Sequence, residues 1–454
     1  MGVTTQHPQY IKNVGSWLKT RAAVDGYPEE LYRYLRVVDK DDPDRQRNYQ
    51  DGAVYQNWTT RTKDFLLGAV FRKPFEVELP PALEYLKQEA DQAGNTLDQF
   101  ARSVVGHTIQ FGRHSILVDF PHTGGAMSRA QERANNVRPY LVEYDAFSLT
   151  NWKEEDGKEV LAVLKECRLS DSITDKYEHL YEDQYRVLEI DENGLYVQRL
   201  VDTSDDDIED PREPKFGGKR PNYLPLFIAG SLNNDICVDP SPLKPIADLN
   251  IAAFRNSADY EESVHLVSQA MLQIDTGNMD AATWDKMNPG GIRFGSSAAV
   301  ITTGGGSASL IQAASNSMAF EALTNKAQQA VQIGSKLVER SGGNETAEAA
   351  RIDSAAETSA LDLIVGNCSV AIESALKTAA EIAGENPDSV TFKLNREFFA
   401  ESIDPQMMAQ AMGLFDRAVI LKEELRGTAV KAGIANPDID NVEAFDRISQ
   451  EVTI

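Results

Sequence analysis

Cysteine is scarce in this sequence. The chain has three cysteines among 454 residues, Cys167, Cys237 and Cys368, and they lie far apart. No CxxC pair or other spacing typical of zinc ligands joins them. We therefore expect three reduced thiols of a cytosolic protein, and neither a disulfide framework nor a cysteine-based zinc site.

Long apolar runs are also missing. The first ten residues are polar and contain no apolar core of a signal peptide, and no window reaches the apolar length of a membrane span. We expect a soluble protein that is made in a cytosol, is not exported through a cleaved signal and has no membrane partner.

Basic residues are outnumbered. The chain has 45 Lys and Arg against 70 Asp and Glu, for a net charge of −25. Because tight nucleic-acid binding depends on Lys and Arg displacing counterions at phosphates, this balance argues against a surface that grips nucleic acid. It remains compatible with a surface past which nucleic acid slides, although many acidic proteins are simply soluble. The hydrophobic content of 42% predicts a sizeable core.

Recognisable catalytic motifs are absent as well. Gly304-Gly305-Gly306-Ser307 lacks the Gly-Lys-Ser/Thr of a phosphate loop, and Gly124-Gly125 lacks the third glycine of a dinucleotide site, so both predict turns. No GxSxG elbow or nucleophilic-cysteine signature occurs. The acidic run Asp205–Asp207 predicts solvated loop charge, because the EF-hand pattern is missing. These absences favour a structural or assembly role without a cofactor.

Four residues that could bind a metal lie close together in the sequence: His107, His114, His122 and Asp119. A metal site needs convergent ligands, but His107 and His114 lie on either side of a predicted helix-to-strand break, without HExxH or similar spacing. We interpret them as ordinary polar or interface residues and predict no metal site.

The first half of the chain predicts helices and then a β-rich region. Apolar residues recur at helical spacing through residues 1–75, and Pro74 is predicted to stop the last helix there. A further amphipathic helix is predicted at 98–110, with Gly112 as its C-cap. Strands are predicted at 115–120, 139–144, 160–166, 185–190, 195–199 and 225–229. Residues 191–194 predict a hairpin turn, and 203–221 an exposed loop.

The second half predicts long helices. Ser241-Pro242 begins one that runs to about Ser268, with Ser241 as N-cap. A second begins near Ser317 and a third covers 346–383, about 57 Å at 1.5 Å per residue. The third is rich in Ala and Ser, which suits close packing on other helices; a central helix of a monomeric bundle is the other interpretation. Further strands are predicted at 271–275, 299–303, 309–313 and 390–394, and two short helices within 404–448.

Several segments between about residues 50 and 380 form a recognisable series. They are Tyr55–Thr62, Gly68–Lys73, Thr96–Arg102, Ile116–Asp119, Ser241–Leu243, Asp248–Ala252, Phe254–Glu261 and Glu345–Arg351. In order and number they resemble the portal proteins of tailed bacteriophages, in a subgroup catalogued as a phage domain of unknown function. None of the segments is a catalytic signature.

The resemblance implies an α+β portal fold with named parts. Residues 1–240, with 387–403 returning to them, would form an α/β wing, and 241–268 and 317–340 the two helices of a stem. A small α/β clip would occupy 269–316 between the stem helices. The remaining parts would be a tunnel loop at 341–345, a long tunnel helix at 346–386 and a short helical crown at 404–454, too short for an extended internal barrel.

The resemblance also implies a function without catalysis. The chain would form a homo-oligomeric ring, a dodecamer, at one vertex of the virion capsid, as the channel for packaging and ejecting double-stranded DNA. Its partners would be the major capsid protein, the terminase large subunit and the head–tail adaptor. Two alternatives remain: another phage structural protein, such as a capsid or tail subunit, and an enzyme whose site leaves no motif.

Two groups of residues become candidates on this basis. The DNA channel would be lined by Ser341, Gly342, Gly343 and Asn344, with the cations Lys326, Lys336, Arg340 and Arg351. The clip would dock its partners through Trp284, Asp285 and Lys286. The alternatives are surface charge without a DNA contact, and a Trp284 that packs inside the clip.

Overall fold

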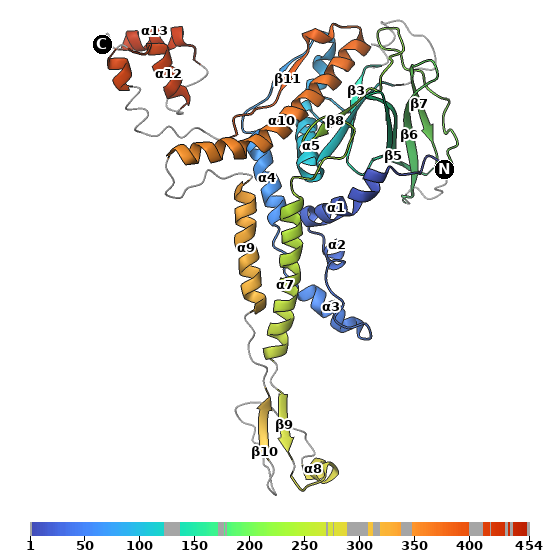
Figure 1. The fold of residues 1–454 in the computed structure, drawn as a ribbon, viewed down its shortest axis with the longest axis vertical. Helices are drawn as coiled ribbons and strands as arrows, with labels where there is room; N and C mark the ends of the chain where they lie inside the picture. Colours follow the sequence, from blue (N-terminus) through green and yellow to red (C-terminus); the bar gives the residue numbers. More distant parts are fainter. Residues whose placement is uncertain are drawn as a thin grey trace.

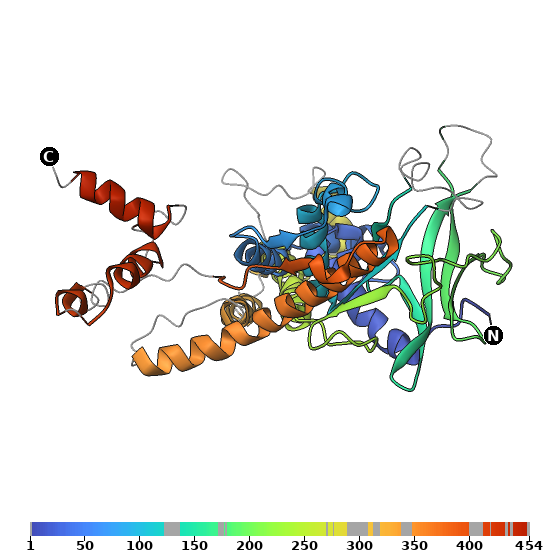
Figure 2. The same cartoon turned by 90° about the horizontal axis from the view of Figure 1, so that it is seen from above.

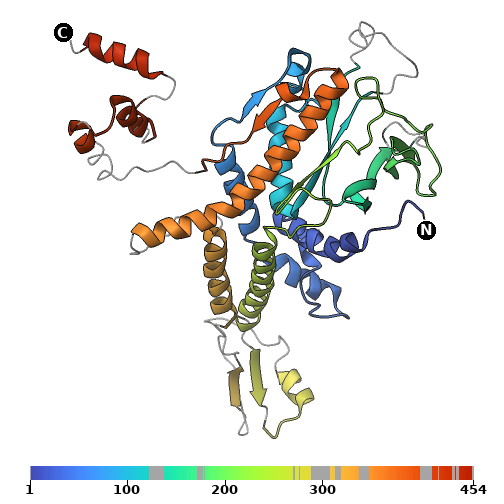
Figure 3. The ribbon, with the colours of Figure 1, turned by 45° about the horizontal axis from the view of Figure 1, so that its top comes forward.

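The computed structural model describes residues 2–121, 137–170, 177, 179–268, 271–275, 277–287, 307–311, 318–336, 347–398, 412–417, 419–431, 435 and 439–451. The protein is 47% helical and 20% strand, so the mixed helix-and-sheet class is confirmed. Figure 1 shows an α/β body from which a helical hairpin projects. The C-terminal helices α12 (Lys422–Lys431) and α13 (Asn441–Glu451) lie apart from the body in all three ribbon views (Figures 1, 2 and 3).

The N-terminal region is helical, as predicted. It contains α1 (Pro8–Asp25), α2 (Pro28–Tyr32), α3 (Pro43–Gly52) and α4 (Trp58–Val70), which ends just before the predicted stop. Two short elements that the sequence did not predict follow, β1 (Glu76–Glu78) and the 3₁₀ helix η1 (Pro81–Lys87).

The helix predicted at 98–110 is confirmed as α5 (Leu97–Phe111). The Thr96 hydroxyl and the Gln99 side chain form a capping box at its start. Gly112 ends it with φ +85°, and an added Cβ would lie 2.6 Å from the carbonyl oxygens of Asp239 and Pro240. Only glycine therefore fits this turn, which leads directly into the next strand.

Two antiparallel sheets form the centre of the body. In the first, β2 (Arg113–Asp119) lies between β3 (Tyr140–Tyr144) and β8 (Leu226–Gly230), which confirms the three predicted strands. Every residue of β2 is buried. Even-numbered Ile116 and Val118 belong to one hydrophobic core and odd-numbered Leu117 to another, because side chains alternate across a strand. Strand β2 thus divides two cores.

The second sheet is a meander in the order β4-β5-β6-β7. Its strands are β4 (Leu149–Glu155), β5 (Lys158–Leu169), β6 (Tyr181–Ile190) and β7 (Tyr196–Val201). The predicted meander of three strands is confirmed, but the prediction lacked β4. The second half of β4 is charged and exposed, and its pairing with β5 has two register shifts, so the alternation that indicates a strand is lost there.

The helical hairpin follows β8. Helix α7 (Lys244–Ser268) descends and α9 (Met318–Lys336) returns, and they are connected through β9 (Met271–Asp275), α8 (Ala281–Met287) and β10 (Ser307–Ile311). Strands β9 and β10 pair antiparallel, which confirms 271–275 and moves 309–313 two residues earlier. The sequence did not predict α8, and the strand predicted at 299–303 lies outside the described residues.

The start of α7 corrects one prediction. The helix begins at Lys244 and not at Pro242. The Ser241 hydroxyl instead donates to the carbonyl oxygen of Gln110 at 2.6 Å. This buried bond ties the segment before α7 to the end of α5.

Helix α10 (Ala347–Ala383) confirms the long third helix. Its C-terminal part packs into the main core through small residues such as Ala371, Ala375 and Ala379, all at most 2% exposed. In Figure 2 its N-terminal part extends beyond the body. After η2 (Pro387–Ser389) the chain returns to the N-terminal region, because β11 (Thr391–Lys393) pairs with β1. No helix in the described ranges combines the length and apolarity that crossing a membrane requires.

Candidate functional site

The projecting hairpin is the most distinctive feature of the molecule. Helix α7 has 25 residues and α9 has 19, which correspond to about 38 and 29 Å at 1.5 Å per residue. The two helices pack side by side, and the two-stranded tip of β9 and β10 lies beyond them (Figure 1). Helix α7 contacts α1, α3 and α4 of the body, as far along as Glu262, and the two-stranded tip lies beyond these contacts. The hairpin is therefore anchored at one end.

Asn250 of α7 is the centre of this anchor. Its side chain is 1% exposed, and Oδ1 accepts from the backbone N–H groups of Trp58 and Thr59 at 3.0 and 3.1 Å and from the Thr59 hydroxyl at 3.0 Å. Its Nδ2 donates to the Gln56 carbonyl oxygen at 2.7 Å. The first N–H groups of any helix lack partners within the helix. Asn250 of α7 thus caps α4, while the side chain of Asn57 accepts from Thr60 N–H at 3.0 Å.

Further contacts join the same two segments. The Tyr55 hydroxyl donates to the Ala23 carbonyl oxygen at 2.5 Å and lies 3.1 Å from Asn250 Oδ1, and the Tyr55 ring packs edge-on against Phe254 at 5.6 Å. Val54 N–H donates to Ser257 Oγ at 2.9 Å. The segments that carry the resemblance around Tyr55 and Phe254 therefore meet in space, and their shared task is to hold the hairpin on the body.

Ion pairs surround this junction. Lys19 pairs with Asp248 at 2.6 Å and Arg36 with Asp259 at 2.8 Å, while Arg45 lies 3.5 Å from Glu262. The side chains are mostly a quarter to three-fifths exposed, so each pair contributes little to stability by itself. Together they connect α1, α3 and the segment between α2 and α3 to α7.

Large apolar side chains remain exposed on the hairpin and on α10. The exposed fractions are 45% for Val264 on α7 and 72% and 52% for Met318 and Phe320 on α9. On α10, Leu363 is 43% and Val370 57% exposed. Isolated exposed apolar residues are ordinary, and the body has them too, such as Leu169 at 50%, so these side chains are candidate contact residues and no more.

Of the predicted DNA-channel residues, the structure describes the side chain of Lys326 alone. Lys326 is a partly exposed residue in the middle of α9. Lys336 at the end of α9 and Arg351 near the start of α10 are described in their backbone only. Arg340 and Ser341–Asn344 lie outside the described residues, so their predicted position in a channel stays a prediction.

The docking candidates lie on α8, beside the two-stranded tip. Trp284 is half-buried and Lys286 is exposed, while Asp285 is described in its backbone only. The helix begins after Asp280, whose carboxylate accepts from Thr283 N–H at 2.9 Å and from the Thr283 hydroxyl at 2.7 Å. These bonds lower the pKa of Asp280. The cap explains why a helix begins at Ala281. The role of Trp284, Asp285 and Lys286 in docking stays a prediction.

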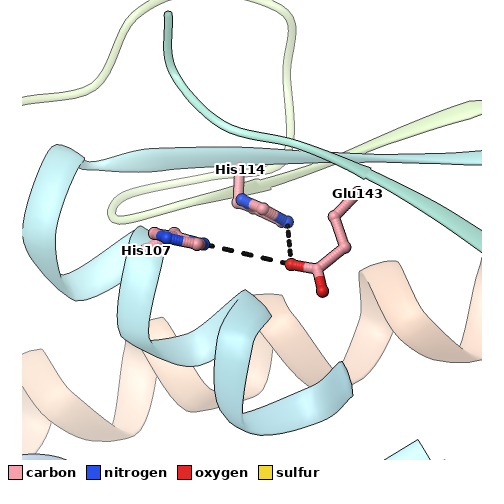
Figure 4. A group of neighbouring side chains, drawn as sticks. All are labelled: His107, His114 and Glu143. Carbon is pink, nitrogen blue, oxygen red and sulfur yellow. Dashed lines mark ion pairs between the residues drawn. The ribbon is translucent and has the colours of Figure 1, made fainter. Parts of the chain in front are cut away.

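A polar cluster lies in the body, where no site was predicted. His107 of α5, His114 of β2 and Glu143 of β3 point toward one another (Figure 4). His114 Nε2 lies 3.2 Å and His107 Nδ1 4.0 Å from Glu143 Oε2, and the nearly parallel imidazole rings are 5.0 Å apart between centroids. The hydroxyl of Ser103, one turn before His107, donates to Glu143 Oε2. We expected the helix-to-strand break between His107 and His114 to keep these residues apart, but the turn from α5 to β2 brings their two imidazole rings together.

Strand pairing explains which acidic residue joins the histidines. Glu143 pairs with Ile116, and His114 lies two residues before Ile116 on the same face of β2, so it is a diagonal neighbour of Glu143. Asp119 has the opposite parity and faces the second sheet, where it lies 3.4 Å from Arg186. His122 is outside the described residues. The alternation of β2 and the β2–β3 register are the signals that identify Glu143 and exclude Asp119.

Burial sets the electrostatics of the cluster. The side chain of His114 is 1% exposed, against 35% for His107 and 22% for Glu143. Burial, with smaller contributions from His114 and Lys63, lowers the pKa of His107 to about 4. Burial alone would raise the pKa of Glu143, but the imidazole of His114 and the Ser103 hydroxyl outweigh it and leave that pKa below its ordinary value. The cluster therefore holds a carboxylate beside a neutral His107 ring.

A second buried network joins the two sheets. Arg186 of β6 donates from Nε to Glu166 at 2.6 Å, and the Tyr144 hydroxyl donates to the same carboxylate at 2.5 Å. Burial alone would raise the pKa of Glu166, but Arg186 outweighs it, with help from Tyr144 and Gln184, and the pKa lies below its ordinary value. Here the buried carboxylates have a permanent cation as partner, so the network is a structural one.

Residues 242–383 match a family described as Domain of unknown function (DUF4055). The neck of an empty gene transfer agent particle matches at 12% identity and TM-score 0.45, over 87% of this chain and 94% of that one. The virion of a native gene transfer agent particle matches at 12% identity and a TM-score of 0.44, over 92% of this chain and 99% of that one. A HK97-family phage portal protein from Corynebacterium diphtheriae matches at 13% identity and a TM-score of 0.34, over 78% of this chain and 99% of that one. No curated protein matches the chain. Solved structures similar to this chain thus include a phage portal protein, the class that its sequence motifs resemble.

Proposed function

We propose that this chain is the portal protein of a tailed bacteriophage, a subunit of a ring at one capsid vertex through which double-stranded DNA is packaged and ejected. The observation that carries the proposal is the hairpin of α7 and α9, which stands clear of both sheets, is anchored at one end and ends in a separate tip (Figure 1). A lone hairpin of this length leaves most of its surface uncovered. Copies side by side would cover it.

Lateral contacts between copies would use the apolar residues of the extending elements. Phe320 on α9 and Leu363 and Val370 on α10 are between 43% and 57% exposed in the single chain. A ring of identical subunits uses heterologous contacts that a rotation closes. We propose twelve subunits, with α10 packed around the ring behind the channel.

The parts of the ring follow the order of the chain. The wing would comprise 1–240 with 387–403, a division that the pairing of β11 with β1 supports. The stem would comprise 241–268 and 317–340, and the clip 269–316. The tunnel loop at 341–345, the tunnel helix at 346–386 and the crown at 404–454 would complete the subunit.

The partners would contact different parts of this ring. The tip around Trp284, Asp285 and Lys286 would dock the terminase large subunit during packaging and the head–tail adaptor afterwards. The wing would contact the major capsid protein. Exchange of the docked partner requires a surface that projects from the ring, and the tip lies at the far end of the hairpin (Figure 3).

The charge of the chain supports a channel that does not hold its cargo. With a net charge of −25, most of the wall would repel phosphates. A few cations, Lys326, Lys336, Arg340 and Arg351, would touch the DNA backbone beside Ser341–Asn344. Replacing all four by Gln should change packaged genome length or DNA retention. Unchanged values would contradict the contact, and the matched control replaces four exposed lysines of the body: Lys153, Lys158, Lys215 and Lys219.

The native mass of the purified full chain, with negative-stain images, tests the ring itself. We expect rings with a central hole and a mass of several subunits. Leu363→Asp with Val370→Asp should lower the ring fraction, because a buried unpaired charge at a contact is costly. Leu169→Asp, at a similarly exposed leucine of the four-stranded sheet, should leave the rings intact.

Other outcomes of the same measurement would overturn the proposal. A compact monomer with one deep pocket would favour an enzyme. An assembly without a central hole or projecting hairpins would favour a capsid or tail subunit.

A further inference from the structure

We propose that His107, His114 and Glu143 form a binding site for one divalent transition-metal ion of the Zn²⁺ class in the body of the protein (Figure 4). One ligand atom of each residue lies within 4.8 Å of those of the other two. Two imidazoles and one carboxylate are a ligand set that zinc uses, with a fourth position open to water. Two nitrogen ligands disfavour Ca²⁺ and Mg²⁺, which prefer oxygen.

The buried imidazole of His114 is the first independent observation. Its side chain is 1% exposed, and neither ring nitrogen has a hydrogen-bond partner in the described part of the chain. Nε2 lies 3.2 Å from Glu143 Oε2, but the contact does not have the direction of a hydrogen bond. Buried polar atoms without a partner are rare in native proteins. A metal ion between the ring and Glu143 would use the imidazole lone pair.

The missing cation at Glu143 is the second observation. Among the described residues, Glu143 forms ion pairs with the two histidines and with no Lys or Arg. The neighbouring Lys63 ammonium donates to Gln110 Oε1 at 2.6 Å. Glu166 in the other network has Arg186 as its cation. A half-buried carboxylate that faces two imidazoles, with no Lys or Arg beside it among the described residues, is where a metal ion would supply the missing charge.

The surroundings fit a small site that solvent can reach. Ser103 donates to Glu143 Oε2 and lies 3.3 Å from His107 Nδ1, so its hydroxyl lines the same site. The side chain of His107 is 35% exposed, which leaves a path for the ion and for a water ligand. The ion would tie α5 to the β2–β3 pair.

Calorimetric titration of the EDTA-stripped full chain with Zn²⁺ alone tests the site. We expect one equivalent per chain, and no comparable binding of Ca²⁺ or Mg²⁺. His107→Gln and Glu143→Gln should each weaken binding at least about tenfold, a loss that even outer-shell changes can cause. His179→Gln, the same change at an exposed histidine elsewhere, should leave binding unchanged. No stoichiometric binding, or binding unchanged in both site variants, would overturn the proposal.

Co²⁺ substitution gives a readout that does not depend on affinity. We expect the intense visible absorption of a four-coordinate ion with nitrogen ligands in the native chain and its loss in His107→Gln. A weak six-coordinate spectrum, the same in both, would also overturn the proposal. His107 is partly exposed, so His107→Gln should keep the native circular dichroism, which is measured alongside. Binding is counted per chain, so the outcome is independent of whether the chain forms rings.

Discussion

The junction at Asn250 is where the fold of the body determines the direction of the hairpin, and Asn250→Leu tests that reasoning. The substitution keeps a similar volume and removes the side-chain amide. Thr59, at 0% exposure, then loses the partner of its backbone N–H and of its hydroxyl. Trp58 N–H keeps its contact with the Gln56 carbonyl oxygen at 2.9 Å, and Gln56 itself is exposed and can turn that oxygen to water.

The expected loss follows from the two groups that stay buried. A buried donor left without a partner costs about 1–3 kcal/mol, and the Thr59 hydroxyl can rotate away from part of that cost. We therefore expect Asn250→Leu to lower the free energy of unfolding of the body by about 3 kcal/mol. Asn13→Leu should change it by less than about 0.5 kcal/mol, because the half-exposed Asn13 makes one bond to the carbonyl oxygen of Gln9.

Guanidinium unfolding, followed by tryptophan fluorescence, measures the free energy of unfolding of both variants. All samples are kept at one protein concentration, so that any assembly affects their stabilities equally. Trp58 lies at the junction and reports on it directly. The combination of Asn250→Leu with Thr59→Val should cost less than the sum of the single changes, because residues that share a hydrogen bond are coupled. A midpoint of Asn250→Leu equal to that of the unchanged chain, or additive losses, would refute the anchor.

Three further predictions concern the body. Gly112→Ala should be the most damaging of three matched changes in thermal unfolding, because φ is +85° and Cβ would meet two carbonyl oxygens. Gly157→Ala, where φ is also positive but the space is open, should cost about 1 kcal/mol. Gly68→Ala, at an exposed position of a helix, should stabilise the protein by about 0.5–1 kcal/mol. A different order would contradict the steric account. Arg186→Met should cost about 3–5 kcal/mol at pH 7 by leaving buried Glu166 without its cation, whereas Lys87→Met, at an exposed pair, should cost less than about 0.5 kcal/mol. Because the folded pKa of Glu166 is lowered, the stability that its carboxylate contributes is complete above the ordinary pKa of 4.5 and is lost as the pH falls through the folded pKa. Glu166→Gln should therefore flatten the acid side of the curve of stability against pH. An unchanged curve would speak against the network. Ellman's reagent should titrate two thiols in the native chain, Cys167 and Cys237, and Cys368 only after unfolding, since burial raises the pKa of Cys368 to about 12; three reactive thiols in the native chain would be the contrary result.

Local signals account for much of what could be predicted about the fold. The helical spacing of apolar residues, the stop before Pro74 and the glycine at position 112 placed the N-terminal helices and α5. The alternation in 185–201 placed β6 and β7. These features depend on contacts within a few residues, so a single segment contains the information. The long helices of the second half were predictable for the same reason, apart from the start of α7.

Contacts between distant segments were beyond the reach of the sequence. The pairing of β1 with β11 joins two strands of three residues each that are more than 300 positions apart, and neither has a pattern long enough to indicate its partner. The cap of α4 by Asn250 joins residues 191 and 192 positions apart. Helix α8 has only seven residues, too few for local spacing to indicate a helix, and it begins at the Asp280 cap.

By itself, the sequence determined the long helices and most of the strands, the acidic balance and the absence of a catalytic signature, because these follow from composition and local spacing. Only the tertiary structure decided how they meet. Asn250 anchors the hairpin because α7 crosses the start of α4. Glu143 joins His107 and His114 because the β2–β3 register places it diagonally from His114, while the alternation of β2 directs Asp119 to the other core. A strand specifies two faces, and only its neighbours decide what each face meets.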